Sequence, residues 1–232
     1  MNYWLLTTEF PPIHGGGIST YCWHTAKMMA NNGHSVKVFV NDYNVSGTLR
    51  ESPIANVEII RFSPNQVSKG KILGTDARLS MEFAHIIELE MIQKGIPDIL
   101  ETQDYKGISY YILQKKKLLY PYFKELKVVL TMHAPSFLYF EYNQVPRFKF
   151  PDYWAGEMEK ATIRMSDLVI SPSQYLIDEL TPRMNLLDKN PVRIFNPYNN
   201  EWSSGEIPEF EEFDLVFFGK LTPQKGGLEM LS

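Results

Sequence analysis

Hydrophobic positions along this chain fall into short runs rich in β-branched and aromatic residues, separated by longer amphipathic stretches. Such alternation predicts strand–helix–strand crossover units and a parallel sheet. The polar segment 41–56 and the aromatic-rich segment 134–150 are predicted to be loops. The fold class that follows is α/β, with a doubly wound, mostly parallel, Rossmann-like sheet. We expect strands at residues 3–7, 35–40, 57–62, 98–102, 127–132, 167–171 and 192–195, and helices at 18–32, 78–94, 109–119, 152–165 and from 173 onward.

The composition of the chain changes after residue 195. From 196 to 213 the residues are mainly Asn, Pro, Ser, Glu and Gly without hydrophobic periodicity, which is typical of an interdomain linker. A new strand-like run and a glycine-rich turn then follow. We therefore predict a first domain over 1–197, a linker over 198–213 and the beginning of a second domain over 214–232. The second domain is expected to continue beyond Ser232.

Composition and charge narrow the classes of protein that fit. The chain is 44% hydrophobic and 22% charged, as expected for a folded globular domain. A formal charge of -4 argues against nucleic acid as a partner, because nucleic-acid binding needs an extended basic surface. Cys22 is the only cysteine, which favours a cytoplasmic location. No segment approaches the ~20 apolar residues of a membrane-spanning helix, whereas peripheral contact with a membrane stays open.

The glycine-rich segment 9–17 lies between the first predicted strand and the first predicted helix. It is therefore expected at the carboxyl edge of the sheet, where parallel α/β folds bind ligands. Glycines let the main chain approach an anion, and the N-terminus of a helix offers unpaired N–H groups. The segment lacks the dinucleotide-binding fingerprint and the P-loop lysine. It is predicted to be either a phosphate site or a tight turn without a ligand.

A second glycine-rich turn, at residues 219–227, carries Lys220 and Lys225 after the predicted strand 214–218. Two flexible lysines at this spacing can bind a diphosphate as point charges. Taken by themselves they fit a solvated loop slightly better. The turn becomes informative only together with the other motifs of the chain.

Six motifs follow one another along the sequence. They are Pro11-Pro12 with Gly15-Gly16-Gly17, then Asn32-Gly33-His34-Ser35-Val36, Pro97-Asp98-Ile99-Leu100, Thr131-Met132-His133, the run from Met165 to Ser173, and Gly219-Lys220-Leu221 with Lys225-Gly226. In this order and spacing the chain resembles the family-four retaining glycosyltransferases over nearly its whole length. The resemblance implies the GT-B fold, in which two Rossmann-like domains face each other, and makes the first domain the acceptor-binding half.

The resemblance also implies roles for particular residues. Gly16 and Gly17 would bind the donor diphosphate through main-chain N–H groups, and Lys220 and Lys225 would neutralise the departing nucleoside diphosphate, so that no metal or other cofactor is required. The family usually has arginine where Lys220 stands, and lysine would lose bidentate phosphate binding. His133 matches a histidine near the sugar and the acceptor, which gives it the catalytic assignment. Its alternative role is to end a strand with a main-chain hydrogen bond.

Further polar side chains follow predicted strands at the same edge of the sheet. Glu9, Asp104 and Tyr105 are candidates to bind acceptor hydroxyls, although they could equally cap helices or hold loops. Glu157 is expected to be structural. The five histidines lack the spacing of metal ligands, so no metal site is predicted.

The function implied for the complete enzyme is transfer of a hexose from a nucleotide sugar to a hydroxyl group of a glycan or lipid-linked acceptor, with retention of configuration. The family's paired glutamates would lie beyond Ser232, so the chain alone is expected to be inactive. One alternative is a GT-B nucleotide-sugar epimerase. Another is a sugar- or nucleotide-binding module without catalysis.

Overall fold

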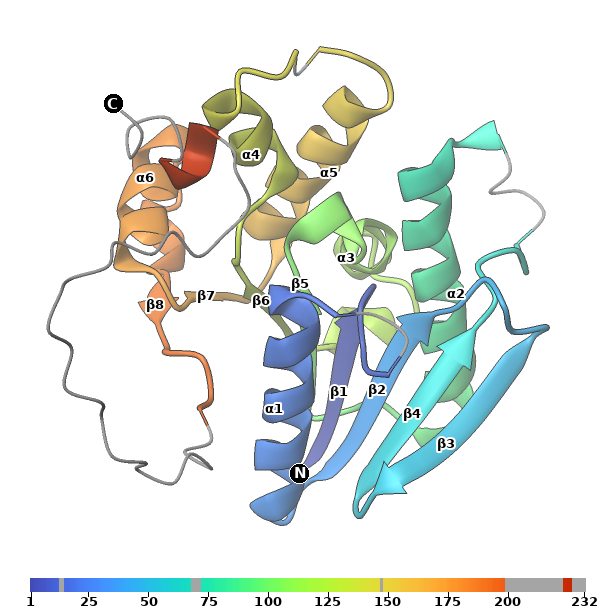
Figure 1. Cartoon of the computed structure of the whole chain (residues 1–232). Coiled ribbons are helices and arrows are strands. Elements are labelled where there is room, and N and C mark those ends of the chain that lie inside the picture. The colour runs from blue at the N-terminus through green and yellow to red at the C-terminus, as the bar shows by residue number, and fades with distance from the viewer. Residues whose placement is uncertain (13–14, 68–71, 147, 199–222, 227–232) are drawn as a thin grey trace, which may run out of the picture.

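A single eight-stranded sheet forms the centre of the computed structural model, which describes residues 1–12, 15–67, 72–146, 148–198 and 223–226 (Figure 1). The strand order is β3-β4-β2-β1-β5-β6-β7-β8. Every neighbouring pair is parallel except β3 with β4. The strands are β1 Asn2–Thr7, β2 Ser35–Asn41, β3 Thr48–Ile54, β4 Val57–Phe62, β5 Ile99–Gln103, β6 Val128–Thr131, β7 Leu168–Ser171 and β8 Val192–Arg193.

Helices connect the strands and cover both faces of the sheet (Figure 1). The α-helices are α1 Gly17–Asn31, α2 Thr75–Lys94, α3 Tyr110–Lys117, α4 Ser136–Tyr142, α5 Asp152–Met165 and α6 Gln174–Met184. Short 3-10 turns are η2 Tyr105–Gly107, η3 Phe123–Glu125, η4 Leu187–Lys189 and η5 Pro223–Lys225. The predicted α/β class with a doubly wound, mostly parallel sheet is thereby confirmed.

The core is divided by the sheet into two layers because successive side chains of a strand point to opposite faces. On β1, Tyr3 and Leu5 pack with α1 on one face, whereas Trp4 and Leu6 pack with α2 and α3 on the other. A third cluster joins β6 and β7 to α4, α5 and α6. All of β1 beyond its first residue is buried, which explains its continuous apolar sequence.

Two segments that the sequence analysis predicted to be loops contain regular structure. β3 lies within the predicted loop 41–56 and pairs antiparallel with β4. α4 lies within the predicted loop 134–150. The last predicted strand, 192–195, is reduced to the two residues of β8. The predicted strand 214–218 and most of the predicted linker lie outside the described residues.

The order of the strands reverses next to β1. The chain runs from β1 outward through β2 to β4, and then returns to β5 on the other side of β1. At such a reversal the loops after two neighbouring parallel strands lead to opposite faces, which opens a crevice at the carboxyl ends of the strands. The loops that follow β1, β5 and β6 therefore meet at the edge where a ligand is expected.

Candidate functional site

The first side of the candidate site is the beginning of α1. Gly16 precedes the helix with extended backbone (φ 168°, ψ 177°), and its carbonyl accepts hydrogen bonds from the N–H and the hydroxyl of Thr20, both at 2.9 Å. Gly16 and Gly17 are exposed, and the first turn contains no acidic residue. Unpaired N–H groups and the helix dipole favour an anion at this position. Binding of a donor diphosphate by these glycines stays a prediction.

Glu9 lies directly beside this helix start. A Cβ on Gly16 would be only 2.8 Å from Glu9 Oε2, so any larger residue at position 16 must displace the carboxylate. The main chain of Glu9 is held by Thr7, whose Oγ1 accepts from the N–H of Glu9 and donates to its carbonyl. Glu9 thus contributes negative charge to the place where the resemblance expects a phosphate. The contact of Glu9 with acceptor hydroxyls stays a prediction.

His133 forms the opposite side, immediately after β6. Its main-chain N–H donates to Asp104 Oδ2 at 3.1 Å, and its Nε2 lies 2.5 Å from Gln103 Oε1. Gln103 Nε2 points to Glu101 Oε1 at 3.4 Å, and because an ionised carboxylate only accepts, the amide oxygen is directed at the histidine. The proton of the ring is therefore on Nε2. Nδ1 is left as the acceptor of the imidazole.

The imidazole of His133 is neutral at pH 7. The side chain is largely enclosed, and its ring centroid lies 4.6 Å from that of Tyr21 on α1 in an edge-to-face arrangement. Burial lowers the pKa of His133 to about 4, because the charged form loses its hydration. His133 can thus accept a hydrogen bond from a hydroxyl group, but it does not offer positive charge to a leaving group.

A buried carboxylate, Glu101, organises the residues beneath His133. It accepts hydrogen bonds from the hydroxyls of Tyr21 and Thr131, both at 2.8 Å, and from the hydroxyl of Tyr3. Burial and the nearby charge of Glu101 raise the pKa of Tyr21, which keeps its hydroxyl protonated as a donor. Glu101 is not among the site residues predicted from the sequence. The available signal was an acidic residue directly after the two apolar positions Ile99 and Leu100 of the predicted strand 98–102.

A second buried acidic pair, Asp104 and Glu159, joins the loops around the site. Asp104 is fully buried, and within the described residues its Oδ1 has no hydrogen-bond partner. Burial, and secondly the charge of Glu159, raise the pKa of Asp104. Glu159 accepts from the N–H groups of Lys106 (2.9 Å) and Phe137 (3.2 Å) and from the hydroxyl of Ser136, and burial raises its pKa as well. These contacts fasten η2 and α4 to α5.

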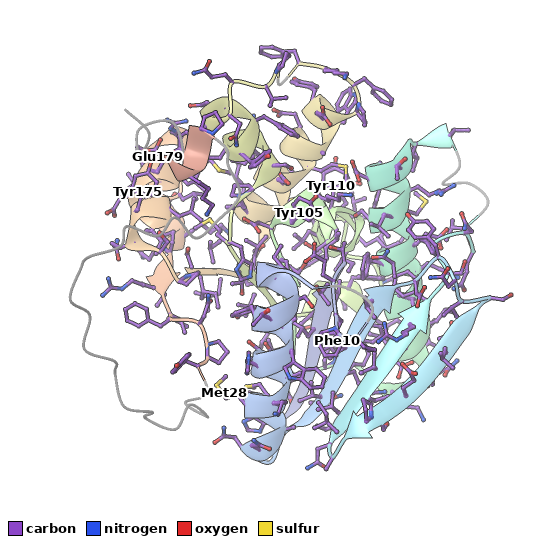
Figure 2. All side chains as sticks on the ribbon, in the orientation of Figure 1. Phe10, Met28, Tyr105, Tyr110, Tyr175 and Glu179 are labelled. Atoms are coloured by element: carbon purple, nitrogen blue, oxygen red, sulfur yellow. The ribbon has the colours of Figure 1, made fainter. Side chains whose placement is uncertain are left out.

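The remaining predicted residues differ in how far the structure places them. Tyr105, half-buried in η2, lies at the upper edge of the sheet in Figure 2, with Lys106 Nζ 5.4 Å from its ring. Lys225 is exposed in η5, which lies next to α4. Lys220 lies outside the described residues. Glu157 pairs at 2.6 Å with Lys160 on the surface of α5.

The site as a whole is thus a junction of two groups. Glu9, Gly16 and Gly17 lie after β1, and Asp104, Tyr105 and His133 lie after β5 and β6. Tyr21 connects the groups, because it belongs to α1 and contacts both Glu101 and the ring of His133. Within the described residues, no cluster of three or more His, Cys, Asp or Glu side chains could hold a metal ion. Nor does any helix in this part of the chain have the length and apolar character needed to cross a membrane.

Three solved structures of similar fold illustrate the likeness. The catalytic domain of starch synthase IV from Arabidopsis thaliana superposes with a TM-score of 0.56 at 16% identity, over 84% of this chain and 51% of that one. Sucrose-phosphate synthase from Thermosynechococcus elongatus gives 0.56 at 18% identity, over 83% and 47%. Os79 from O. sativa gives 0.51 at 12% identity, over 83% and 50%. The chain thus spans about half the length of these proteins, and its fold is that of a GT-B glycosyltransferase domain.

The sequence gives the family directly. The profile described as Glycosyltransferase Family 4 matches residues 15–201, well over half of the chain. The protein belongs to glycosyltransferase family 4, and the resemblance noted in its motifs is confirmed. A comparison with curated protein sequences gives no match.

Proposed function

We propose that this chain forms the acceptor-side half of an enzyme that transfers a hexose from a nucleoside-diphosphate sugar to a hydroxyl group of a glycan or lipid-linked acceptor, with retention of configuration. The observation that carries the proposal is the contact of Tyr21, one turn into α1, with His133 at the reversal of strand order, in a chain of glycosyltransferase family 4. Among proteins of similar fold, the starch synthase is bound to ADP and Os79 to UDP, which supports a nucleotide donor.

In this proposal the main-chain N–H groups of Gly16 and Gly17 bind oxygens of the donor diphosphate. Lys220 and Lys225 belong to the facing half of the site, where their charge stabilises the departing nucleoside diphosphate without a metal ion. Neutral His133 accepts a hydrogen bond at Nδ1 from a hydroxyl group of the transferred sugar. Tyr105 and Glu9 are proposed to bind acceptor hydroxyls, whereas Asp104 holds the main chain of His133 through the hydrogen bond from its N–H.

Retention is proposed to occur by attack of the acceptor on the same face from which the phosphate leaves, with the leaving phosphate taking the proton of the acceptor. The carboxylates closest to His133 support this view. Asp104 and Glu101 are both buried and engaged in hydrogen bonds to the protein, so neither is presented to a sugar as a nucleophile. No observation favours an epimerase or a binding module without catalysis.

Calorimetric titration of the 232-residue chain with UDP, ADP and GDP tests the donor side. Valine at position 16 would displace Glu9 and cover the helix start, whereas a Cβ at Gly15 meets nothing within 4 Å. We expect Gly16→Val to weaken binding of the preferred nucleotide by about tenfold or more, and Gly15→Val to preserve it. Equal affinities of the two variants would contradict the assigned phosphate position.

The transfer reaction itself requires the complete enzyme, with a labelled nucleotide sugar as donor. The anomeric configuration of the product, read by NMR, should equal that of the donor. An inverted product would overturn the proposed mechanism. Turnover by the 232-residue chain alone at the rate of the complete enzyme would overturn the division of the site between two halves.

A further inference from the structure

Aromatic side chains gather on the surface where α4 ends and α5 begins. Phe148 is 76% exposed, Phe150 67% and Trp154 59%. Between the two helices lies a hollow of about 200 Å³, which we call the aromatic pocket. Its rings are Phe137 and Phe140 of α4, Phe148 of the connecting segment and Tyr153 of α5, and its polar groups are Asp152, Glu157 and Lys160.

The aromatic pocket lies on the same side of the sheet as the candidate site. In Figure 1, α4 and the start of α5 project beyond the edge at which the strands β5 and β6 end. α4 begins only three positions after His133. Glu159 fixes the pocket to the site, because one of its oxygens accepts from the N–H of Phe137 and the other from the N–H of Lys106 beside Tyr105. The pocket is therefore held at a fixed position relative to His133.

The chemistry of the pocket suits a sugar ring. Phe148 and Tyr153 lie with ring centroids 5.8 Å apart at an interplanar angle of 31°, and both line the hollow with apolar surface. Lys160 Nζ lies 5.1 Å from the ring centroid of Phe137 and 2.6 Å from Glu157 Oε1, which offers a donor and an acceptor together. A pyranose has an apolar C–H face and a rim of hydroxyls that both donate and accept.

The size and charge of the pocket narrow the class of ligand. At about 200 Å³ the hollow is smaller than the ~300–1,000 Å³ of a typical small-molecule site, so it suits a single ring better than a longer chain. A docking surface for anionic lipid would carry an excess of Lys and Arg. Here the basic residues Arg147, Lys149 and Lys160 are matched over residues 136–160 by Glu141, Asp152 and Glu157, without counting the fully buried Glu159.

We propose that the aromatic pocket is a subsite for one pyranose unit of a glycan acceptor, remote from the hydroxyl group that reacts. The subsite fixes the direction of the acceptor by binding a unit behind the reacting one. In naming the glycan as the acceptor, this inference rests on the proposed function. Binding of a sugar in the pocket does not itself require catalysis, so the two can be tested separately.

The test uses the 232-residue chain on an array of neutral and anionic oligosaccharides of two to six units, with Phe148→Ala and Tyr153→Ala as pocket variants. Tyr43→Ala is the matched control, because Tyr43 is 58% exposed and follows β2 on the other half of the sheet. We expect wild type and Tyr43→Ala to retain the same glycans. Each pocket variant should bind them about tenfold more weakly, as is typical when an aromatic anchor is truncated. Nucleotide affinity should be unchanged in all variants.

Three results would overturn the subsite. The wild-type chain could retain no glycan on the array, or the pocket variants could bind as tightly as wild type. The third is binding of vesicles of phosphatidylglycerol and phosphatidylcholine that depends on Phe148 and Tyr153 in the absence of glycan binding, which would assign the rings to a membrane surface. Loss of nucleotide binding or transfer with intact, pocket-dependent glycan binding would contradict the proposed function alone.

Discussion

The neutral state of His133 makes a quantitative prediction about stability and pH. Burial lowers the pKa of His133 in the folded protein to about 4, whereas an unfolded histidine titrates near ~6.5. Between these values the unfolded chain binds a proton that the folded chain does not. The free energy of unfolding therefore falls as the pH drops through this window. Above pH ~6.5 the histidine is neutral in both states, and this loss of stability is absent.

The size of the effect follows from the two pKa values. A shift of ~2.5 units corresponds to at most ~3.4 kcal/mol, of which about 2 kcal/mol is lost between pH ~8 and pH ~5. Asp104 and Glu159 act in the opposite direction, because burial raises their pKa values and their contribution is lost as the pH rises. The pH profile of the wild-type protein is therefore a sum of opposing terms, and a variant is needed to isolate the histidine.

His133→Gln serves this purpose because glutamine does not titrate and its amide can still donate to Gln103 Oε1. Urea unfolding of both proteins, followed by tryptophan fluorescence at pH ~5, ~6.5 and ~8, gives the difference in unfolding free energy at each pH. We expect the advantage of wild type over the variant to shrink by about 2 kcal/mol between the highest and the lowest pH. If the two proteins lose stability in parallel, the neutral buried state of His133 is wrong.

Two further predictions concern residues that hold the segments around the site against α5, and both are tested by urea unfolding. Gly107 has φ 58°, and a Cβ there would lie 2.7 Å from the Cβ of Met158. Gly107→Ala should therefore lower the free energy of unfolding by about 2–5 kcal/mol. Gly95→Ala, at φ 84° with no atom within 4 Å, should cost only ~1–2 kcal/mol, and equal losses would refute the steric argument. Glu159→Gln should lower the free energy of unfolding by about 1–3 kcal/mol, because its amide NH₂ would then face the N–H donor of Lys106 or Phe137. The surface control Glu157→Gln should stay within ~0.5 kcal/mol, and a similar loss in both would contradict the role of Glu159.

The elements predicted most accurately from the sequence are those whose own pattern of apolar and polar residues matches their burial. β4 and α5 coincide with the predicted 57–62 and 152–165. β3 was missed because its first six residues are exposed and Pro53 interrupts it, so that neither alternation nor an apolar run was present. It is held by pairing with β4 and by Arg61, whose Nε donates to Glu51 at 2.8 Å.

α4 was missed for a different reason. It has seven residues, too few for a helical period to be recognised, and its first turn is bonded to Glu159. That carboxylate comes from α5, more than twenty positions later in the chain, so the residues around α4 do not by themselves indicate the helix. The same holds for the site. Gly16 and His133 could be placed at one edge from strand order, but the bonds of Glu101 join residues as many as 98 positions apart.

The central position of β1 has a consequence for how the protein is made. β1 pairs with β2 through residues 2–7 and 35–40, but its other edge is closed only by residues 99–101 of β5. During synthesis at ~5–20 residues per second, the roughly 60 residues between these partners take on the order of 3–12 s to appear. Over that interval β1 has one unpaired edge, with Trp4 and Leu6 lacking the partners they later have on β5 and α3. While the nascent chain has passed β2 but not yet reached β5, this unpaired edge of β1 is open to edge-to-edge association with another molecule.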